Sequence, residues 1–167
     1  MTTNKDNRIL MAERAFISWA EVDRLCGLVC AKIAKSGYKP DIIIAVARGG
    51  WVPARIISDR LGVRAAASMG ITFYDHDKKI ANGPTITQFT PELSKGKKVL
   101  LVDDVSDSGK SLWLAKEKLL EAGASKVIVA TIHIKAKTSF VPDFWAKEEN
   151  RWIEYPWEPI EAKKGKA

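Results

Sequence analysis

The sequence predicts an α/β fold in which helices flank a mostly parallel, twisted sheet. Two short and predominantly apolar runs, at 42–46 and 98–102, are rich in β-branched residues, as in strands that are buried on both faces. Each run is followed by a glycine-containing turn and then by apolar residues at helical spacing. A third β-branched run at 126–133 continues this alternation of strands and helices, which is typical of a parallel sheet with helices on both faces.

The first helix is predicted to begin after Ser18. Ser18 and Glu21 have the spacing of a capping box, in which the serine accepts a backbone hydrogen bond and the glutamate reaches back to the serine N–H. Apolar residues then recur at helical spacing as far as a stop at Gly37. Cys26 and Cys30 lie in this pattern. They are too few for a disulfide framework or a zinc site, so we expect buried free thiols.

Two strand–helix units are expected after this helix. Their elements are a strand at 42–46, a helix at 52–61, a strand at 98–102, a turn at 103–109, a helix at 110–121 and a strand at 126–133. Ligands of parallel α/β sheets bind beyond the carboxyl ends of the strands. The loops at 47–50 and 103–110 are therefore the expected ligand-binding segments.

Between the two units, residues 74–96 form a long, polar stretch that contains Gly83, Pro84 and Pro91. We expect a loop here. Loops of this length within a compact domain are usually lids or disordered segments, so a functional lid and a passive surface loop both stay open.

Length and composition predict one domain over residues 1–167, because 46% apolar and 28% charged residues are ordinary values for a soluble globular chain. The apolar runs are far shorter than the ~18 residues of a membrane span. No apolar secretion signal opens the chain, so a cytoplasmic protein without membrane contact is expected. The net charge of +7 favours anionic partners. Apart from a basic tail at 162–167, the basic residues are mixed with acids, and no nucleic-acid partner is expected.

The strongest functional signal is the segment Asp-Asp-Val-Ser-Asp-Ser-Gly-Lys-Ser at 103–111. Here an apolar strand delivers Asp103 and Asp104 to its carboxyl end, and a loop of small residues opens directly into a helix. The backbone N–H groups of 106–111, the hydroxyls and the positive helix end suit a phosphate dianion. The two carboxylates would repel that phosphate, but they can accept hydrogen bonds from vicinal sugar hydroxyls or help to hold a divalent cation.

Two other interpretations of this segment explain it less well. Residues 108–111 resemble the end of a nucleotide-triphosphate P-loop, but that motif requires glycine five residues before Gly109, where Asp104 stands. A carboxylate there would face the triphosphate, which excludes the P-loop. An ordinary strand-to-turn cap explains the acidic pair alone, but not the full order of acids, serines, glycine and lysine.

With these residues the sequence resembles the purine phosphoribosyltransferases of the type I fold, whose 5-phosphoribosyl-1-diphosphate motif has the form of residues 99–111. The resemblance extends from about Ile17 to Glu158. Its other parts are 45–54 as a pyrophosphate loop, 74–77 as the start of a mobile hood at about 74–96, Lys135 as a base-reading lysine, and 152–158 as the base-binding end of the xanthine–guanine subgroup.

The resemblance implies a role for each matching residue. The site for 5-phosphoribosyl-1-diphosphate would comprise Asp103, Asp104, Val105, Ser106, Asp107, Ser108, Gly109, Lys110 and Ser111. Arg48, Gly49 and Lys79 would bind the diphosphate, and a cis peptide bond is implied between Ala47 and Arg48. Asp104 would approach Mg²⁺. Asp107 would face N7 of the purine and take the proton as N9 attacks C1 of the ribose.

The implied purine site joins Asp107 to the segment at about 135–158. Lys135 can donate to a 6-carbonyl but not usefully to a 6-amino group, which favours hypoxanthine, guanine or xanthine. Trp152 would stack on the purine, and the backbone of Ile153 would read position 2. Structural packing is expected for Trp145, Trp157, His76 and His133.

The implied activity is purine salvage by a homodimer or homotetramer. A regulatory protein of the same fold, which senses the same ligand, stays open as an alternative, as does an adenine or pyrimidine phosphoribosyltransferase. Asp107, Lys135 and Trp152 favour the purine enzyme, because a sensor needs the phosphate site more than a proton acceptor. Glu158 stands where close relatives carry a shorter acid, which leaves the preference between xanthine and guanine open.

Overall fold

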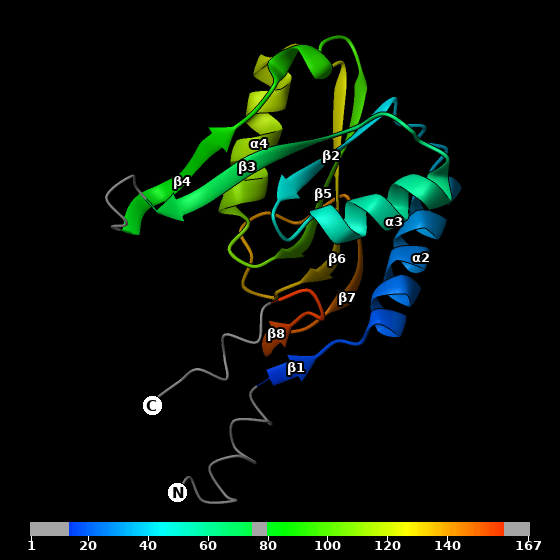
Figure 1. Ribbon diagram of the computed structural model, residues 1–167, viewed down its shortest axis with the longest axis vertical. Coiled ribbons are helices and arrows are strands. Elements are labelled where there is room, and N and C mark those ends of the chain that lie inside the picture. Colours follow the sequence, from blue (N-terminus) through cyan, green and yellow to red (C-terminus); the bar gives the residue numbers. More distant parts are fainter. Residues whose placement is uncertain (1–13, 75–79, 159–167) are drawn as a thin grey trace, which may run out of the picture.

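The computed structural model describes residues 14–74 and 80–158. Its elements are β1 (Arg14–Phe16), α2 (Trp19–Lys35), β2 (Ile42–Ala47), α3 (Trp51–Leu61), β3 (Ala66–Tyr74), β4 (Ile80–Gln88), a 3₁₀ helix (Pro91–Leu93), β5 (Lys98–Ser106), α4 (Lys110–Glu121), β6 (Lys126–Ile134), β7 (Phe144–Glu148) and β8 (Trp152–Glu154). Figure 1 shows α2 and α3 together on one side of the central sheet and α4 on the other.

The central sheet has the strand order β4-β3-β2-β5-β6-β7. Every neighbouring pair is parallel except β3 with β4, which confirms the predicted mostly parallel α/β fold. β1 and β8 form a separate parallel pair that joins the two ends of the described chain. Since β2, β5 and β6 are neighbours, the loops that follow them meet at one edge of the sheet.

The core has two apolar layers because successive residues of a strand point to opposite faces. Ile43 and Leu100 pack with α2 and α3, whereas Ile44 and Leu101 pack with α4. Both faces of β2 and β5 are therefore buried, as their β-branched composition predicts. No helix in the described part of the chain is long and apolar enough to cross a membrane.

The N-terminus of α2 forms half of the expected capping box. The Ser18 hydroxyl accepts a hydrogen bond from the Glu21 N–H at 3.2 Å. The Glu21 carboxylate, which was expected to reach back, instead accepts two hydrogen bonds from Arg24 at 2.7 and 2.8 Å. Cys26 and Cys30 are buried free thiols, as expected.

β5 is longer than the sequence predicted. Residues 103–109 were expected to form a turn, but β5 continues to Ser106 and pairs with β6, with Val105 opposite His133. The longer neighbour explains the difference, because β6 extends to Ile134 and supplies backbone partners for the end of β5. The two acids therefore lie on a rigid strand rather than on a turn.

The prediction of a loop at 74–96 is wrong for much of this range. Ile80–Gln88 forms β4, which pairs antiparallel with β3, and a short 3₁₀ helix follows. Gly83 and Pro84 were interpreted as breaks, but β4 is the edge strand of the sheet, where a missing N–H is tolerated. The hairpin projects from the body of the molecule in Figure 1. Lys79 and His76 lie outside the described residues.

Candidate functional site

The predicted acids and the loop that follows them line one cavity at the carboxyl end of β5. Its volume is about 280 Å³. The lining residues are Phe73, Asp103, Asp104, Val105, Asp107, Ser108, Gly109, Ser111 and Leu112. The cavity therefore joins the end of β5 to the first turn of α4, and a helix N-terminus carries partial positive charge and N–H groups that have no partner within the helix. Phe73, from β3, was not predicted to reach this site.

A larger cavity, of about 790 Å³, lies beside α3 and β3. Its Arg55 and Asp59 pair with each other at 3.0 Å. None of the acids at 103–107 and no part of the 106–111 loop lines it. The predicted acids and the loop that follows them therefore line the smaller cavity and not the larger one.

The two acids favour a partner that brings positive charge or hydrogen-bond donors. Burial and the neighbouring Asp104 raise the pKa of Asp103 well above its usual range. Burial raises the pKa of Asp104 to about 6, and the nearby Glu158 adds to this effect. Asp103 Oδ1 also accepts the Asp104 N–H at 2.9 Å, which fixes one carboxylate against the strand. A cation or sugar hydroxyls bound here would stabilise the charged carboxylates.

These carboxylates fit Mg²⁺ that arrives together with a phosphorylated substrate. Mg²⁺ is usually held by one or two carboxylates, with substrate phosphates and water completing its coordination. Within residues 14–74 and 80–158, no three or more His, Cys, Asp or Glu side chains are grouped so that they could hold a metal alone. Asp104, with Asp103 beside it, remains the residue that is predicted to contribute a protein ligand to Mg²⁺.

The loop between β5 and α4 is braced by the chain after β6. The Ser106 hydroxyl lies 2.9 Å from Thr138 Oγ1 and donates to the Phe140 carbonyl at 2.8 Å. Ser139 donates to the Ser108 carbonyl through both its N–H, at 3.2 Å, and its hydroxyl, at 2.8 Å. Ser106 is buried, so its hydroxyl serves this brace, and its backbone remains the predicted ligand contact.

Gly109 is required where this loop enters α4. Its φ of +79° lies in the left-handed region that favours glycine. A Cβ at this position would also lie 2.5 Å from Phe140 Cβ and 2.8 Å from Thr138 Oγ1. The glycine thus lets the loop that is predicted to bind phosphate pack closely against residues 138–140.

The loop after β2 meets the acids of β5. The peptide bond between Ala47 and Arg48 is cis, which confirms the expectation from the resemblance. Arg48 is exposed at this edge of the sheet. A Cβ on Gly49 would lie 2.3 Å from Asp104 Oδ2, and a Cβ on Gly50 would lie 2.4 Å from the Val102 carbonyl oxygen. The glycine pair therefore allows the predicted diphosphate loop to touch the acidic pair.

Asp107 is exposed and pairs with a residue that the sequence did not single out. Its Oδ1 lies 3.1 Å from Nζ of Lys137. Lys137 lies two residues beyond Lys135, on the loop that also braces Ser106 and Ser108. The only sequence signal for this contact was the expected adjacency of the loops that follow β5 and β6.

Lys135 is buried, so it is not a solvated strand end. It directly follows β6, its Nζ donates to the Arg151 carbonyl, and burial lowers its pKa. Ala136 N–H also donates to Asn150 Oδ1 at 2.9 Å. These contacts tie the start of the loop after β6 to residues 150–151, directly before Trp152, which is the other side chain predicted to bind the purine.

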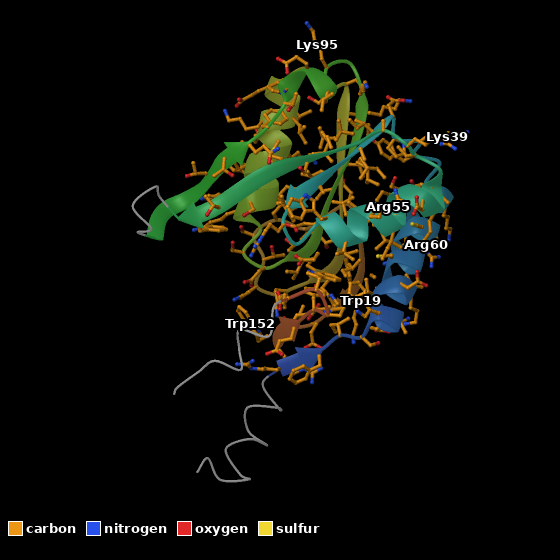
Figure 2. All side chains as sticks on the ribbon, viewed as in Figure 1. Trp19, Lys39, Arg55, Arg60, Lys95 and Trp152 are labelled. Carbon is orange, nitrogen blue, oxygen red and sulfur yellow. The ribbon has the colours of Figure 1, made fainter. Side chains whose placement is uncertain are left out.

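The segment after Arg151 presents an exposed indole on a fixed strand. Trp152 is 66% exposed, and Figure 2 shows it at the β1–β8 end of the molecule. Ile153 is buried and pairs with Ala15 of β1. Trp157 stacks on Tyr155 with ring centroids 4.5 Å apart, which agrees with its predicted packing role.

Tyr155 is a third residue at this site, after Phe73 and Lys137, to which the sequence analysis gave no individual role. Its hydroxyl donates to the backbone carbonyl of Asp104 at 3.2 Å and lies 2.8 Å from Nδ1 of His133. The side chain thus links the segment after β8 to the acidic end of β5. No local sequence motif predicts a contact between two residues that are 51 positions apart.

Comparisons with known proteins agree with this geometry. A family model described as a phosphoribosyl transferase domain matches residues 18–162. The xanthine-guanine phosphoribosyltransferase of Idiomarina loihiensis is 31% identical in an alignment of 149 residues that covers 86% of each chain.

Solved structures show the same fold. The purine phosphoribosyltransferase of Pyrococcus horikoshii OT3 superposes with a TM-score of 0.77 at 36% identity, covering 88% of this chain and 95% of that one. A hypothetical protein from Neisseria gonorrhoeae with bound ppGpp superposes with a TM-score of 0.78 at 27% identity, covering 91% and 93% of the two chains.

Proposed function

Because the chain belongs to the phosphoribosyltransferase family, we propose that it transfers the 5-phosphoribosyl group of 5-phosphoribosyl-1-diphosphate to N9 of a 6-oxopurine. The products are diphosphate and a nucleoside monophosphate. The observation that carries this proposal is the single cavity in which Asp103 and Asp104 adjoin the loop at the N-terminus of α4. Such a cavity offers one end to sugar hydroxyls and the other to a phosphate.

The substrate is held at three points. Backbone N–H groups of 106–111 bind the 5′-phosphate at the helix N-terminus. The carboxylates of Asp103 and Asp104 accept hydrogen bonds from the ribose hydroxyls. Arg48 and the backbone of Gly49 bind the diphosphate, with Lys79 as a further predicted contact. Asp104 would hold the Mg²⁺ that arrives with the substrate, and this ion would neutralise charge on the departing diphosphate.

Asp107 is the proposed general base. The bond between C1 of the ribose and the diphosphate oxygen breaks as N9 of the purine bonds to C1, and Asp107 takes the proton from N7. The positive charge that develops on the sugar is stabilised by the carboxylates around it. Lys137 pairs with Oδ1 of Asp107, and the exposed carboxylate can offer its other oxygen to the purine.

Lys135 and Trp152 support a 6-oxopurine as the acceptor. Lys135 is a buried donor that contacts the backbone carbonyl of Arg151, and the next residue, Trp152, has an exposed indole. A donor and an exposed ring on one segment suit a 6-carbonyl on a stacked base. The ppGpp bound to the Neisseria neighbour is a guanine nucleotide, which supports a product of this class. An adenine or pyrimidine acceptor would leave Lys135 without its proposed partner.

The activity is tested by a panel of acceptors. Hypoxanthine, guanine, xanthine, adenine and orotate are each incubated with 5-phosphoribosyl-1-diphosphate and Mg²⁺, and nucleotide formation is followed by chromatography. We expect nucleotides from one or more of the 6-oxopurines and none from adenine or orotate. Binding of 5-phosphoribosyl-1-diphosphate without nucleotide from any base would favour the sensing protein instead.

Replacing Lys135 by alanine is expected to raise the KM for the 6-oxopurine more than the KM for 5-phosphoribosyl-1-diphosphate. The lost contact is a hydrogen bond to a charged group, whose usual contribution of ~1.5–3 kcal/mol corresponds to roughly 10- to 150-fold. Steady-state kinetics with each substrate varied in turn gives both constants. Lys126→Ala is the control, because Lys126 begins β6 at its opposite end. Equal increases in both constants would contradict the base-reading role.

A further inference from the structure

We infer that Tyr155 is a positioning residue whose hydroxyl, oriented by His133, fixes the Asp104 peptide and thereby the acidic pair that receives the ribose. This inference rests on the proposed function, since it assigns Tyr155 a task in binding the sugar. It concerns a buried pair of side chains, His133 and Tyr155, which the proposed chemistry does not otherwise use.

The contacts of Tyr155 determine where its proton lies. The Asp104 carbonyl oxygen can only accept, so the Tyr155 hydroxyl donates its single proton there, at 3.2 Å. The phenolic oxygen is then an acceptor toward His133 Nδ1, which lies 2.8 Å away. His133 must therefore carry its proton on Nδ1.

The other nitrogen of His133 agrees with this assignment. Nε2 is buried and has no hydrogen-bond partner among the described residues. A bare Nε2 is consistent with a neutral ring, and burial lowers the pKa of His133 to about 4. Nearby charges act in both directions: Lys147 and Lys135 lower this pKa, whereas Glu149 and Glu21 raise it. A neutral His133 donates one hydrogen bond, and that bond goes to Tyr155.

The hydrogen bond from Tyr155 to the Asp104 carbonyl lies next to the predicted ribose site. His133 lies on β6 opposite Val105 of β5, immediately after the acidic pair. The Asp104 carbonyl that Tyr155 binds belongs to the residue whose carboxylate lines the cavity. Tyr155 is held in turn by its stack on Trp157. The hydroxyl thus anchors the backbone of Asp104 from a fixed ring.

The chain offers a matched control for the loss of this hydroxyl. Tyr38 also donates its hydroxyl to a backbone carbonyl of β5, that of Val99, at 2.9 Å. Val99 lies at the amino end of the strand, far from the acids. Tyr155→Phe and Tyr38→Phe therefore remove the same kind of hydrogen bond from the two ends of one strand.

For Tyr155→Phe we expect kcat/KM for 5-phosphoribosyl-1-diphosphate to fall by roughly three- to tenfold, the usual weight of one neutral hydrogen bond. The KM for the purine should change less, because β8 remains paired with β1. Tyr38→Phe should lower the thermal unfolding midpoint about as much as Tyr155→Phe does, but it should leave kcat/KM unchanged. Wild-type kinetics in Tyr155→Phe, or an equal loss in Tyr38→Phe, would overturn the inference.

Nitrogen NMR of the wild-type protein provides a test that does not depend on enzymatic activity. The chain has two histidines, so a His133→Gln spectrum assigns the resonances. We expect His133 to be neutral with its proton on Nδ1. A proton on Nε2, or a charged ring at pH 7, would overturn the inference. If the wild-type protein forms no nucleotide with any base, the proposed function fails, whereas this spectrum still decides the tautomer.

Discussion

Asp107→Asn lowers turnover by roughly 10²–10⁴, the usual contribution of general acid–base catalysis. The amide has nearly the same shape as the carboxylate but cannot accept the purine proton. Binding of 5-phosphoribosyl-1-diphosphate, measured by calorimetry, should persist because the phosphate contacts of the loop are backbone N–H groups. Unchanged turnover in this variant would remove Asp107 from the chemistry.

Lys137→Ala distinguishes the role of the Asp107 carboxylate from the role of its ion pair with Lys137. This change removes the partner that lies 3.1 Å from Asp107 but leaves the carboxylate in place. Exposed ion pairs contribute little to stability, so the variant should fold normally. We expect a far smaller loss of turnover than in Asp107→Asn. A loss of the same size would show that the pair, rather than the carboxylate, is what matters.

Gly49→Ala is expected to lower kcat/KM for 5-phosphoribosyl-1-diphosphate by roughly 10²-fold. The added methyl group would lie 2.3 Å from Asp104 Oδ2, so the carboxylate must move aside. A displacement of about 1 Å in a substrate-positioning group has a cost of this order. The protein should stay folded, because a side-chain end can move where a backbone cannot. Steady-state kinetics and circular dichroism measure the two effects.

Gly83→Ala provides the comparison for this substitution. A Cβ at Gly83 meets no heavy atom within 4 Å, so this variant makes the same chemical change on β4 without a clash. Its kinetics should match the wild-type protein. If Gly49→Ala also keeps full activity, the close approach of the β2 loop to Asp104 has no role in binding the substrate.

The sequence predicted the parts of the site that depend on local patterns. The acids, the small-residue loop and the helix start are contiguous at 103–111, and their types alone indicate phosphate and sugar binding. The parallel strand order predicted that the loops at 47–50 and 103–110 would both lie at the ligand-binding edge, whereas the close approach of Gly49 to Asp104 is seen only in the structure. Ser106 shows the limit of such reasoning: its hydroxyl looked available in the motif but is used by Thr138 and Phe140.

What the sequence could not predict depends on long-range contacts and on cooperation between neighbouring strands. Residues 80–88 contain glycine and proline, and they become a strand only because β3 offers a partner at the edge of the sheet. The extension of β5 to Ser106 depends in the same way on β6. Tyr155 and Lys137 reach Asp104 and Asp107 from remote segments, and no spacing rule connects them.

A crystal structure with bound guanosine 5′-monophosphate tests the whole account most directly. We expect the 5′-phosphate to lie within hydrogen-bond distance of the backbone N–H groups of 106–111. We expect the ribose hydroxyls to contact Asp103 and Asp104. A nucleotide whose phosphate lies anywhere else, with that loop left free, would contradict it.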